Sequence, residues 1–196
     1  MSHDVLIVGH SFISRLRSSL GSNNSHLKVN FGVEEASDNI SFIAQPGGRL
    51  SDIERLIPRI ASHLPSICFV QIGGNDISRA FDNHVEIAHG MLDLAKKILA
   101  ETSCKRLYFG QLLYRFEGRY LSANQAVIYQ SNVKAINSLL KTLFDSIDSV
   151  TLWDLRGLKK PATVVMLDDG VHLNPHGMVL YYKAIRGAIL HGLKYA

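Results

Sequence analysis

The 196-residue sequence predicts an α/β fold, a three-layer α/β/α sandwich in which helices cover both faces of a five-stranded parallel sheet. Short apolar segments with strand-forming composition alternate about five times with segments of helical periodicity, which is typical of such sandwiches. In addition, the runs "VLIV" (residues 5–8) and "CFVQI" (68–72) are apolar along nearly their whole length. Runs of this kind are typical of strands that are buried on both faces of a parallel sheet.

The expected strands span residues 5–8, 27–33, 67–72, 106–110 and 150–153. Between them, helices are expected where apolar residues recur every three or four positions. They span residues 51–62, 84–100 and 126–144, and a last helix begins at "NPHG" (174–177). In that motif Asn174 suits the N-cap position and Pro175 suits the first helical position. No repeat, linker or low-complexity tract interrupts the chain, so a single domain over residues 1–196 is expected.

Composition excludes several classes of protein. A hydrophobic fraction of 46% and a charged fraction of 19% are those of an ordinary soluble protein. The net charge of +4 comes from scattered basic residues without interleaved aromatics, so binding of nucleic acid is not indicated. No apolar run reaches the roughly 20 residues of a membrane helix, and the first run is too short for a signal peptide. We therefore expect a cytoplasmic protein, or a domain excised from a longer chain; the oligomeric state is not indicated.

No metal or other cofactor is expected. The two cysteines, Cys68 in an apolar run and Cys104 near a helix-to-strand connection, form no CxxC motif and predict no disulfide scaffold. The histidines show no metal-ligand spacing such as HExxH. Phosphate-loop and dinucleotide-binding glycine motifs are absent as well.

Four expected loops carry small or polar residues that suit a functional site. They are "GHS" (9–11), "PGG" (46–48), "GGND" (73–76) and "DDGVH" (168–172). Ligands of open parallel sheets bind at the carboxyl ends of the strands, where these loops are expected. We therefore expect the four loops to contribute to one site.

The residues in these loops suit ester hydrolysis. A serine hydroxyl needs a base to take its proton, and that base needs a partner to orient it. Asp169 and His172 are three residues apart, so the carboxylate can hold one ring nitrogen while the other faces Ser11. The oxyanion that forms needs preorganised donors. The backbone N–H groups of Ser11 and Gly48 and the side-chain amide of Asn75 are candidates.

Each loop also has a simpler interpretation. Ser11 suits a helix N-cap, and Gly47-Gly48 suits an ordinary turn. The "GGND" and "DDGVH" segments suit a capped turn and a surface turn with a satisfied histidine. His10 is a poor candidate for the base, because adjacent side chains of an extended segment point to opposite sides.

Taken in order, "VGHSFISRL", "PGGRLSDI", "VQIGGNDIS" and "DDGVHLNPHGMVLYYKAI" resemble the four sequence blocks of the SGNH hydrolases, or GDSL esterases and lipases. The resemblance implies a flavodoxin-like sheet with strand order 2-1-3-4-5. It also implies that Ser11 is the nucleophile and that His172 is the base, oriented by Asp169. The implied oxyanion hole consists of Ser11, Gly48 and Asn75. Acyl or acetyl esters of lipid or carbohydrate type are the implied substrates, and no cofactor is implied.

The sequence departs from the family pattern at two positions. In the first block, His10 replaces the usual Asp. In the second block, the residue after the glycine is often Asp or Ser, and here it is Arg49. Gly47 remains an alternative to Gly48 as the donor. The Gly-His-Ser variant is similar to the esterase domains carried by some animal non-LTR retrotransposons, which would imply a lipid or acetyl ester.

The segment "QLLYRFEGRYLSAN" (111–124) follows the fourth expected strand at the same sheet edge. Tyr114, Arg115, Phe116 and Tyr120 are therefore candidates for the substrate pocket, together with His10, although ordinary packing of the aromatic residues is an alternative.

The second interpretation of the whole chain is a catalytically weak or inactive module that keeps this fold and binds lipid, glycan or RNA.

Overall fold

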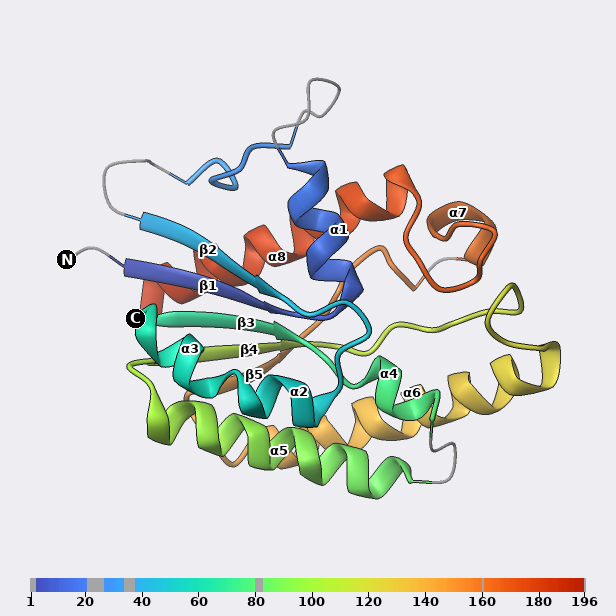
Figure 1. Ribbon diagram of the computed structural model, residues 1–196, viewed down its shortest axis with the longest axis horizontal. Helices are drawn as coiled ribbons and strands as arrows, with labels where there is room; N and C mark the ends of the chain where they lie inside the picture. Colours follow the sequence, from blue (N-terminus) through green and yellow to red (C-terminus); the bar gives the residue numbers. More distant parts are fainter. Residues whose placement is uncertain (1–2, 21–26, 34–37, 80–82, 160, 196) are drawn as a thin grey trace.

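The computed structural model describes residues 3–20, 27–33, 38–79, 83–159 and 161–195, and it consists of a five-stranded sheet between two layers of helices (Figure 1). The strand order is β2-β1-β3-β4-β5 and each neighbouring pair is parallel, as predicted. The strands are β1 (His3–Gly9), β2 (Asp38–Ala44), β3 (Ile67–Gln71), β4 (Arg106–Gly110) and β5 (Val150–Trp153).

Helices cover both faces of the sheet. One face carries α1 (Ser11–Ser19), α7 (Ala162–Val165) and α8 (Pro175–Tyr195). The other face carries α2 (Leu50–Arg55), α3 (Ile57–Ser62), α4 (Gly74–Ile77), α5 (His84–Glu101) and α6 (Ala123–Phe144). The strands end on the side where α1 and α4 begin, so the loops that follow them share one edge of the sheet (Figure 1).

The sheet separates two hydrophobic cores. Leu6 and Val8 of β1 pack in the core beneath α5 and α6, whereas Val5 and Ile7 pack in the core beneath α8. Successive side chains of a strand point to opposite faces, so a strand between two cores is apolar throughout. This burial explains the uninterrupted apolar run at residues 5–8.

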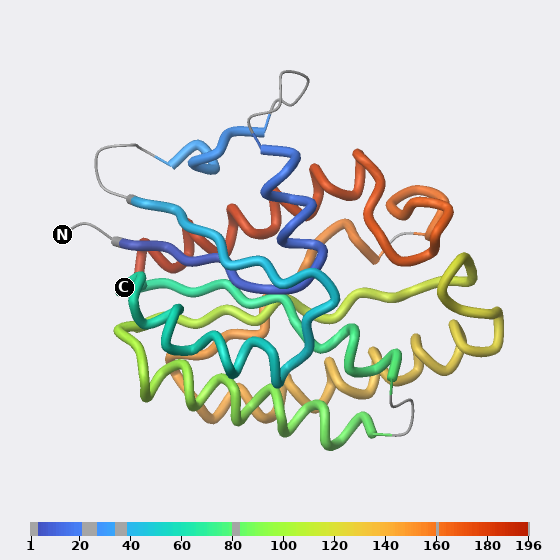
Figure 2. Tube along the Cα trace, viewed as in Figure 1, coloured from blue at the N-terminus to red at the C-terminus, as the bar shows by residue number. Residues whose placement is uncertain are grey.

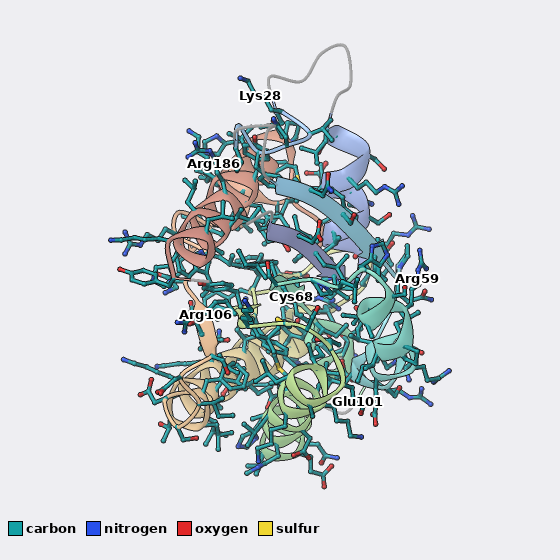
Figure 3. The ribbon with its side chains drawn as sticks, turned by 90° about the vertical axis from the view of Figure 1, so that its left-hand side faces the viewer. Lys28, Arg59, Cys68, Glu101, Arg106 and Arg186 are labelled. Carbon is teal, nitrogen blue, oxygen red and sulfur yellow. The ribbon has the colours of Figure 1, made fainter. Side chains whose placement is uncertain are left out.

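Both cysteines are buried as free thiols. Figure 3 shows Cys68 in the interior, while Arg59 and Glu101 lie on the helices outside the sheet. The expected position of Cys68 in a core is confirmed.

The prediction of a strand at residues 27–33 was wrong, because this segment forms turns and the second strand is β2. Within it, Asn30 accepts a hydrogen bond from the Gly32 N–H (3.1 Å) and donates one to the Val33 carbonyl (3.0 Å). Gly32 has a φ of +65°, which suits glycine. An asparagine and a glycine within three residues are turn formers, and they outweigh the apolar alternation around them. The missed strand "DNISFIA" follows directly after residues that lie outside the described part.

The helix predictions are largely confirmed, with one difference. The expected helix at 51–62 is divided at Leu56 into α2 and α3, and Pro58 lies in the first turn of α3, where its missing N–H costs no hydrogen bond. The three longer helices α5, α6 and α8 lie where they were expected. The short helices α4 and α7 span a single turn each and carry no periodic signal.

Asn174 caps α8, as predicted, and also anchors the loop before it. Its Oδ1 accepts from the Gly177 N–H (2.8 Å), and its Nδ2 donates to the carbonyls of Val164 (3.1 Å) and Met166 (3.2 Å).

Asn174→Ala should lower the free energy of unfolding by about 1–2 kcal/mol in urea denaturation. Asn174→Asp keeps the cap but replaces both donors by a carboxylate oxygen that the two carbonyls repel, so it should also lower that free energy. Equal stability of Asn174→Ala and the wild type would contradict this role.

Candidate active site

The first part of the site depends on how closely β1 approaches β3. A Cβ atom on Gly9 would lie 2.4 Å from the Gln71 carbonyl oxygen, so only glycine permits this approach. The His10 N–H donates to the same oxygen (3.2 Å), and the Gly9 carbonyl accepts from the Gln45 N–H (2.8 Å). These contacts hold the turn that places Ser11 at the first position of α1.

His10, not Ser11, is the N-cap of α1. Its Nδ1 accepts a hydrogen bond from the Phe12 N–H (3.4 Å). The alternative in which Ser11 serves as the cap is therefore wrong. Within the described residues the Ser11 hydroxyl makes no hydrogen bond, and its N–H lies in the first helical turn, where backbone donors lack intrahelical acceptors. Both groups of Ser11 are thus available to a ligand.

His10 is a buried, neutral histidine rather than a base. Burial lowers its pKa to about 3, and the positive charge of Arg115 acts in the same direction. Because Nδ1 accepts a hydrogen bond, the ring proton belongs on Nε2. His10 is only 2% exposed and does not line the cleft that Ser11 faces, so the prediction that it contributes to the substrate pocket is corrected.

Asp169 and His172 form the pair that their spacing predicts. The His172 Nδ1 lies 2.7 Å from the Asp169 Oδ2, while the Asp169 Oδ1 accepts from the backbone N–H groups of His172 (2.8 Å) and Val171 (2.9 Å). Burial opposes ionisation of Asp169, but these hydrogen bonds outweigh it, and the pKa of the carboxyl is lowered. An ionised Asp169 orients the ring so that Nε2 is left for other contacts.

The His172 ring lies between two aromatic side chains. Phe12 packs edge-on at 6.4 Å between ring centroids, and Tyr120 does so at 6.2 Å on another side. The ring is therefore held by packing as well as by Asp169. His172 itself lines the cleft beside Ser11.

Asn75 is held at both ends of its side-chain amide. Its Nδ2 donates to the Gly48 carbonyl (2.9 Å), and its Oδ1 accepts from the Arg115 Nη2 (2.8 Å). An amide nitrogen carries two hydrogens, so one remains for a ligand. Asn75 lies in α4, which the Tyr129 hydroxyl anchors by donating to the Gly74 carbonyl (3.2 Å).

The "QPGG" segment forms a turn that engages the expected Gly48 donor. Pro46 and Gly47 are the central residues, Gly47 has a φ of +72°, and the Gly48 N–H donates to the Gln45 carbonyl (2.8 Å). Proline followed by a glycine with positive φ is typical of a type II turn. The expectation of a free N–H at Gly48 is corrected, since this group closes the turn. Gly48 instead supplies the carbonyl that holds Asn75, and Gly47 lines the cleft.

Ser11, Asn75 and His172 line one cleft of about 610 Å³, and Asp169 lies behind His172. The cleft is lined by Ser11, Ser14, Arg15, Pro46, Gly47, Asn75, Ser78, Arg115, Tyr120, Leu121, Gln125, Val171 and His172. No hydrogen bond joins Ser11 to His172 in the described part of the chain; such contacts commonly tighten only when substrate is bound. A larger hollow of about 880 Å³ between α1 and α8 contains none of these three residues, so we place the chemistry at the smaller one.

The segment after β4 contributes different residues than the aromatic pattern suggests. Arg115 and Tyr120 line the cleft, but Tyr114 packs against the core beneath α5 and α6, and Phe116 packs against the core beneath α8. The expectation that Tyr114 and Phe116 line the pocket is thus corrected, and the alternative of ordinary packing holds for both. Figure 2 shows this segment extending past the sheet edge before it turns into α6.

Comparison with known proteins identifies the family of the chain. The sequence matches the family model of the GDSL-like lipases/acylhydrolases over residues 6–185. The chain belongs to this family. It is therefore an ester hydrolase of the GDSL type. The four sequence blocks that suggested the family all lie within the matched range. No relative was found among curated protein sequences.

Solved structures of other proteins share the GDSL fold at low sequence identity. A carbohydrate acetylesterase from Sinorhizobium meliloti has a TM-score of 0.72 and 15% identity, covering 97% of this chain and 99% of that one. A GDSL-like lipase from Bacteroides thetaiotaomicron has a TM-score of 0.71 and 13% identity, covering 96% and 88%. An extracellular lipase from Streptomyces rimosus has a TM-score of 0.62 and 14% identity, covering 95% and 100%.

Among the described residues, no group of three or more His, Cys, Asp or Glu side chains is arranged to hold a metal ion. None of the helices in the described part has the length and apolar character needed to cross a membrane.

The buried state of His10 predicts a pH-dependent stability. The unfolded chain binds a proton at His10 below the ordinary pKa of 6.5, whereas the folded protein does so only near pH 3. This residue should therefore destabilise the fold as the pH falls below 6.5, by about 2 kcal/mol between pH 7 and pH 5. His10→Asn keeps a side-chain cap but cannot titrate, so its free energy of unfolding should change less over this range.

The comparison is made by urea denaturation at both pH values. His176→Asn, which removes an exposed histidine at the start of α8, serves as the matched control and should behave as the wild type. An equal loss of stability in the wild type and in His10→Asn would show that His10 is not held neutral.

Proposed function

We propose that this GDSL-family ester hydrolase acts through Ser11 as the nucleophile and His172 as the general base, with Asp169 orienting the base. The observation that carries the proposal is the 2.7 Å contact between Asp169 and His172 at the cleft that Ser11 also lines. Acyl transfer to a serine needs a base for the hydroxyl proton and a group that orients this base, and His172 with one nitrogen held by Asp169 suits both needs.

In the first step the Ser11 Oγ attacks the ester carbonyl carbon while its proton passes to the His172 Nε2. The imidazolium that forms is stabilised by the ionised Asp169 on its other nitrogen. The attack places a negative charge on the former carbonyl oxygen. Ser11 is the first residue of α1, so the positive end of the helix dipole lies beside this charge.

The oxyanion is stabilised by the Ser11 N–H and by the hydrogen of the Asn75 Nδ2 that Gly48 does not occupy. The Gly47 N–H makes no hydrogen bond within the described residues, and Gly47 lines the cleft. We therefore propose Gly47, in place of Gly48, as the source of a third donor.

The second half of the reaction reverses the roles of the same groups. The tetrahedral intermediate collapses to an acyl-Ser11 ester as His172 protonates the leaving alcohol. His172 then takes a proton from water, which attacks the acyl carbonyl, and the collapse of the second intermediate returns the proton to the Ser11 Oγ.

The substrates that we propose are acyl or acetyl esters of a carbohydrate or lipid alcohol. Most residues of the lining are polar or charged, while most of its exposed surface is apolar, so the cleft offers hydrogen-bond partners to a polar alcohol and apolar contacts to an acyl group. The similarity to the acetylesterase from Sinorhizobium meliloti supports an acetyl group.

Active-site labelling tests the nucleophile. A fluorophosphonate probe should attach to Ser11, so that Ser11→Ala shows neither labelling nor hydrolysis of p-nitrophenyl acetate. Ser18→Ala, which removes an exposed hydroxyl from the same helix, should retain both. The proposal is overturned if labelling survives in Ser11→Ala. Absence of labelling and of ester hydrolysis in the wild type would instead favour the binding-module interpretation.

Asp169→Asn tests the orientation of the base. The amide can still accept backbone hydrogen bonds, but a neutral partner no longer stabilises the imidazolium or selects its tautomer, so kcat should fall roughly 10³- to 10⁴-fold with little change in KM. Because the pKa of Asp169 is lowered, the wild-type carboxylate stays ionised at neutral pH, and its titration should not limit activity there. A kcat within tenfold of the wild type would remove Asp169 from this role.

A further inference from the structure

Arg115 is a charged residue of the cleft lining that the reaction described above does not use. It follows β4 and is only 8% exposed. Its Nη1 donates to the Ser78 Oγ (2.6 Å) and its Nη2 donates to the Asn75 Oδ1 (2.8 Å). The guanidinium carbon lies 5.1 Å from the centre of the Tyr129 ring. The side chain is therefore held on two sides by polar groups and on a third by an aromatic face.

The charge of Arg115 is not balanced by an acid. In the described part of the chain no carboxylate lies within 4 Å of the guanidinium, and none lines the cleft. A buried cation without a carboxylate partner is costly, and neutral hydrogen-bond acceptors recover only part of this cost. Such a residue is better explained by what it does to its neighbours than by a contribution to stability.

The main effect of Arg115 is on the orientation of the Asn75 amide. A guanidinium only donates hydrogen bonds, so the group that faces it must be the amide oxygen. The Gly48 carbonyl only accepts, so the group that faces it must be the amide nitrogen. The two contacts together select one of the two flipped orientations of Asn75, and they leave one N–H of its amide without a partner among the described residues.

The surroundings hold Arg115 firmly in this position. A Cβ atom on Gly74 would lie 3.3 Å from the Arg115 Nη2 and 3.1 Å from the Tyr129 hydroxyl, so the glycine leaves space for the guanidinium. The Arg115 carbonyl accepts a hydrogen bond from the Gln130 Nε2 (3.0 Å). Its position is thus fixed from both the backbone and the side chain.

We propose that Arg115 is a positioning residue of the oxyanion hole, which acts on the reaction through Asn75. The guanidinium fixes the donor orientation of the amide. It also withdraws charge through the carbonyl oxygen, so that the remaining N–H is a stronger donor to an oxyanion in this poorly solvated place. This inference rests on the proposed function, because it requires Asn75 to contact the oxyanion.

A double-mutant cycle in p-nitrophenyl acetate hydrolysis tests the proposal. Arg115→Met keeps much of the apolar stem but removes the charge and the donors. In the wild-type background it should lower kcat roughly 10- to 100-fold with little change in KM. In the Asn75→Ala background the same substitution should change kcat by less than about twofold, because the group through which Arg115 acts is missing. Arg79→Met, an exposed arginine just after α4, should leave kcat unchanged in both backgrounds.

Two outcomes would overturn the proposal while leaving the nucleophile in place. Equal falls in both backgrounds would show that Arg115 acts independently of Asn75. A raised KM with an unchanged kcat would show that Arg115 binds substrate instead. A failure of the proposed function is recognised separately, since the wild-type enzyme would then not be labelled at Ser11.

Arg115→Lys keeps the proposal testable if Arg115→Met does not fold, which thermal unfolding monitored by circular dichroism would reveal. Lysine retains the charge but cannot hold two acceptors in a planar fork. Its kcat should lie between those of the wild type and Asn75→Ala, and the remaining effect should vanish in the Asn75→Ala background. An effect of Arg115→Lys that persists undiminished in that background would contradict a role through Asn75.

Discussion

The buried amide of Gln71 at the end of the central strand β3 is the interaction on which the functional edge of the sheet depends. The backbone carbonyl oxygen of Gln71 accepts from the His10 N–H (3.2 Å). In its side chain, Nε2 donates to the Gly110 carbonyl (3.5 Å) and Oε1 accepts from the Tyr181 hydroxyl (3.3 Å). Through this one residue, β3 is hydrogen-bonded to the end of β1, to β4 and to α8. Gly9 and Gly110 leave no side chain in the way, and a Cβ on either would lie within 2.5 Å of Gln71. A buried polar group that is bonded on every side specifies the arrangement of its neighbours.

The segment after β4 connects the two halves of the site. Arg115 donates to Asn75, on the side of the oxyanion donors, and the N–H of the next residue, Phe116, donates to the Gly170 carbonyl (2.8 Å), between Asp169 and His172. Consecutive residues therefore hold the amide that would stabilise the oxyanion and the loop that carries the acid–base pair. A shift of this segment would therefore move both together.

The sequence predicts local features better than it predicts which polar group faces which. The buried strands, the cap at Asn174 and the Asp169–His172 pair all follow from short-range rules, and the structure agrees with them. The prediction of a strand at 27–33 was wrong because the turn-forming residues in this segment outweighed its apolar pattern. Two features were beyond such rules. The Gly48 N–H is engaged because a turn closes on it, and the contact of Arg115 with Asn75 joins residues far apart in the chain.

The most direct test of the account is a crystal structure of the enzyme after reaction with a phosphonate ester, whose phosphoryl oxygen mimics the oxyanion. We predict a covalent bond to the Ser11 Oγ, with the phosphoryl oxygen about 3 Å from the Ser11 nitrogen and the Asn75 Nδ2, and with Asn75 Oδ1 still bonded to Arg115. A phosphonate attached to another residue, or an Asn75 amide turned away from the phosphoryl oxygen, would contradict it.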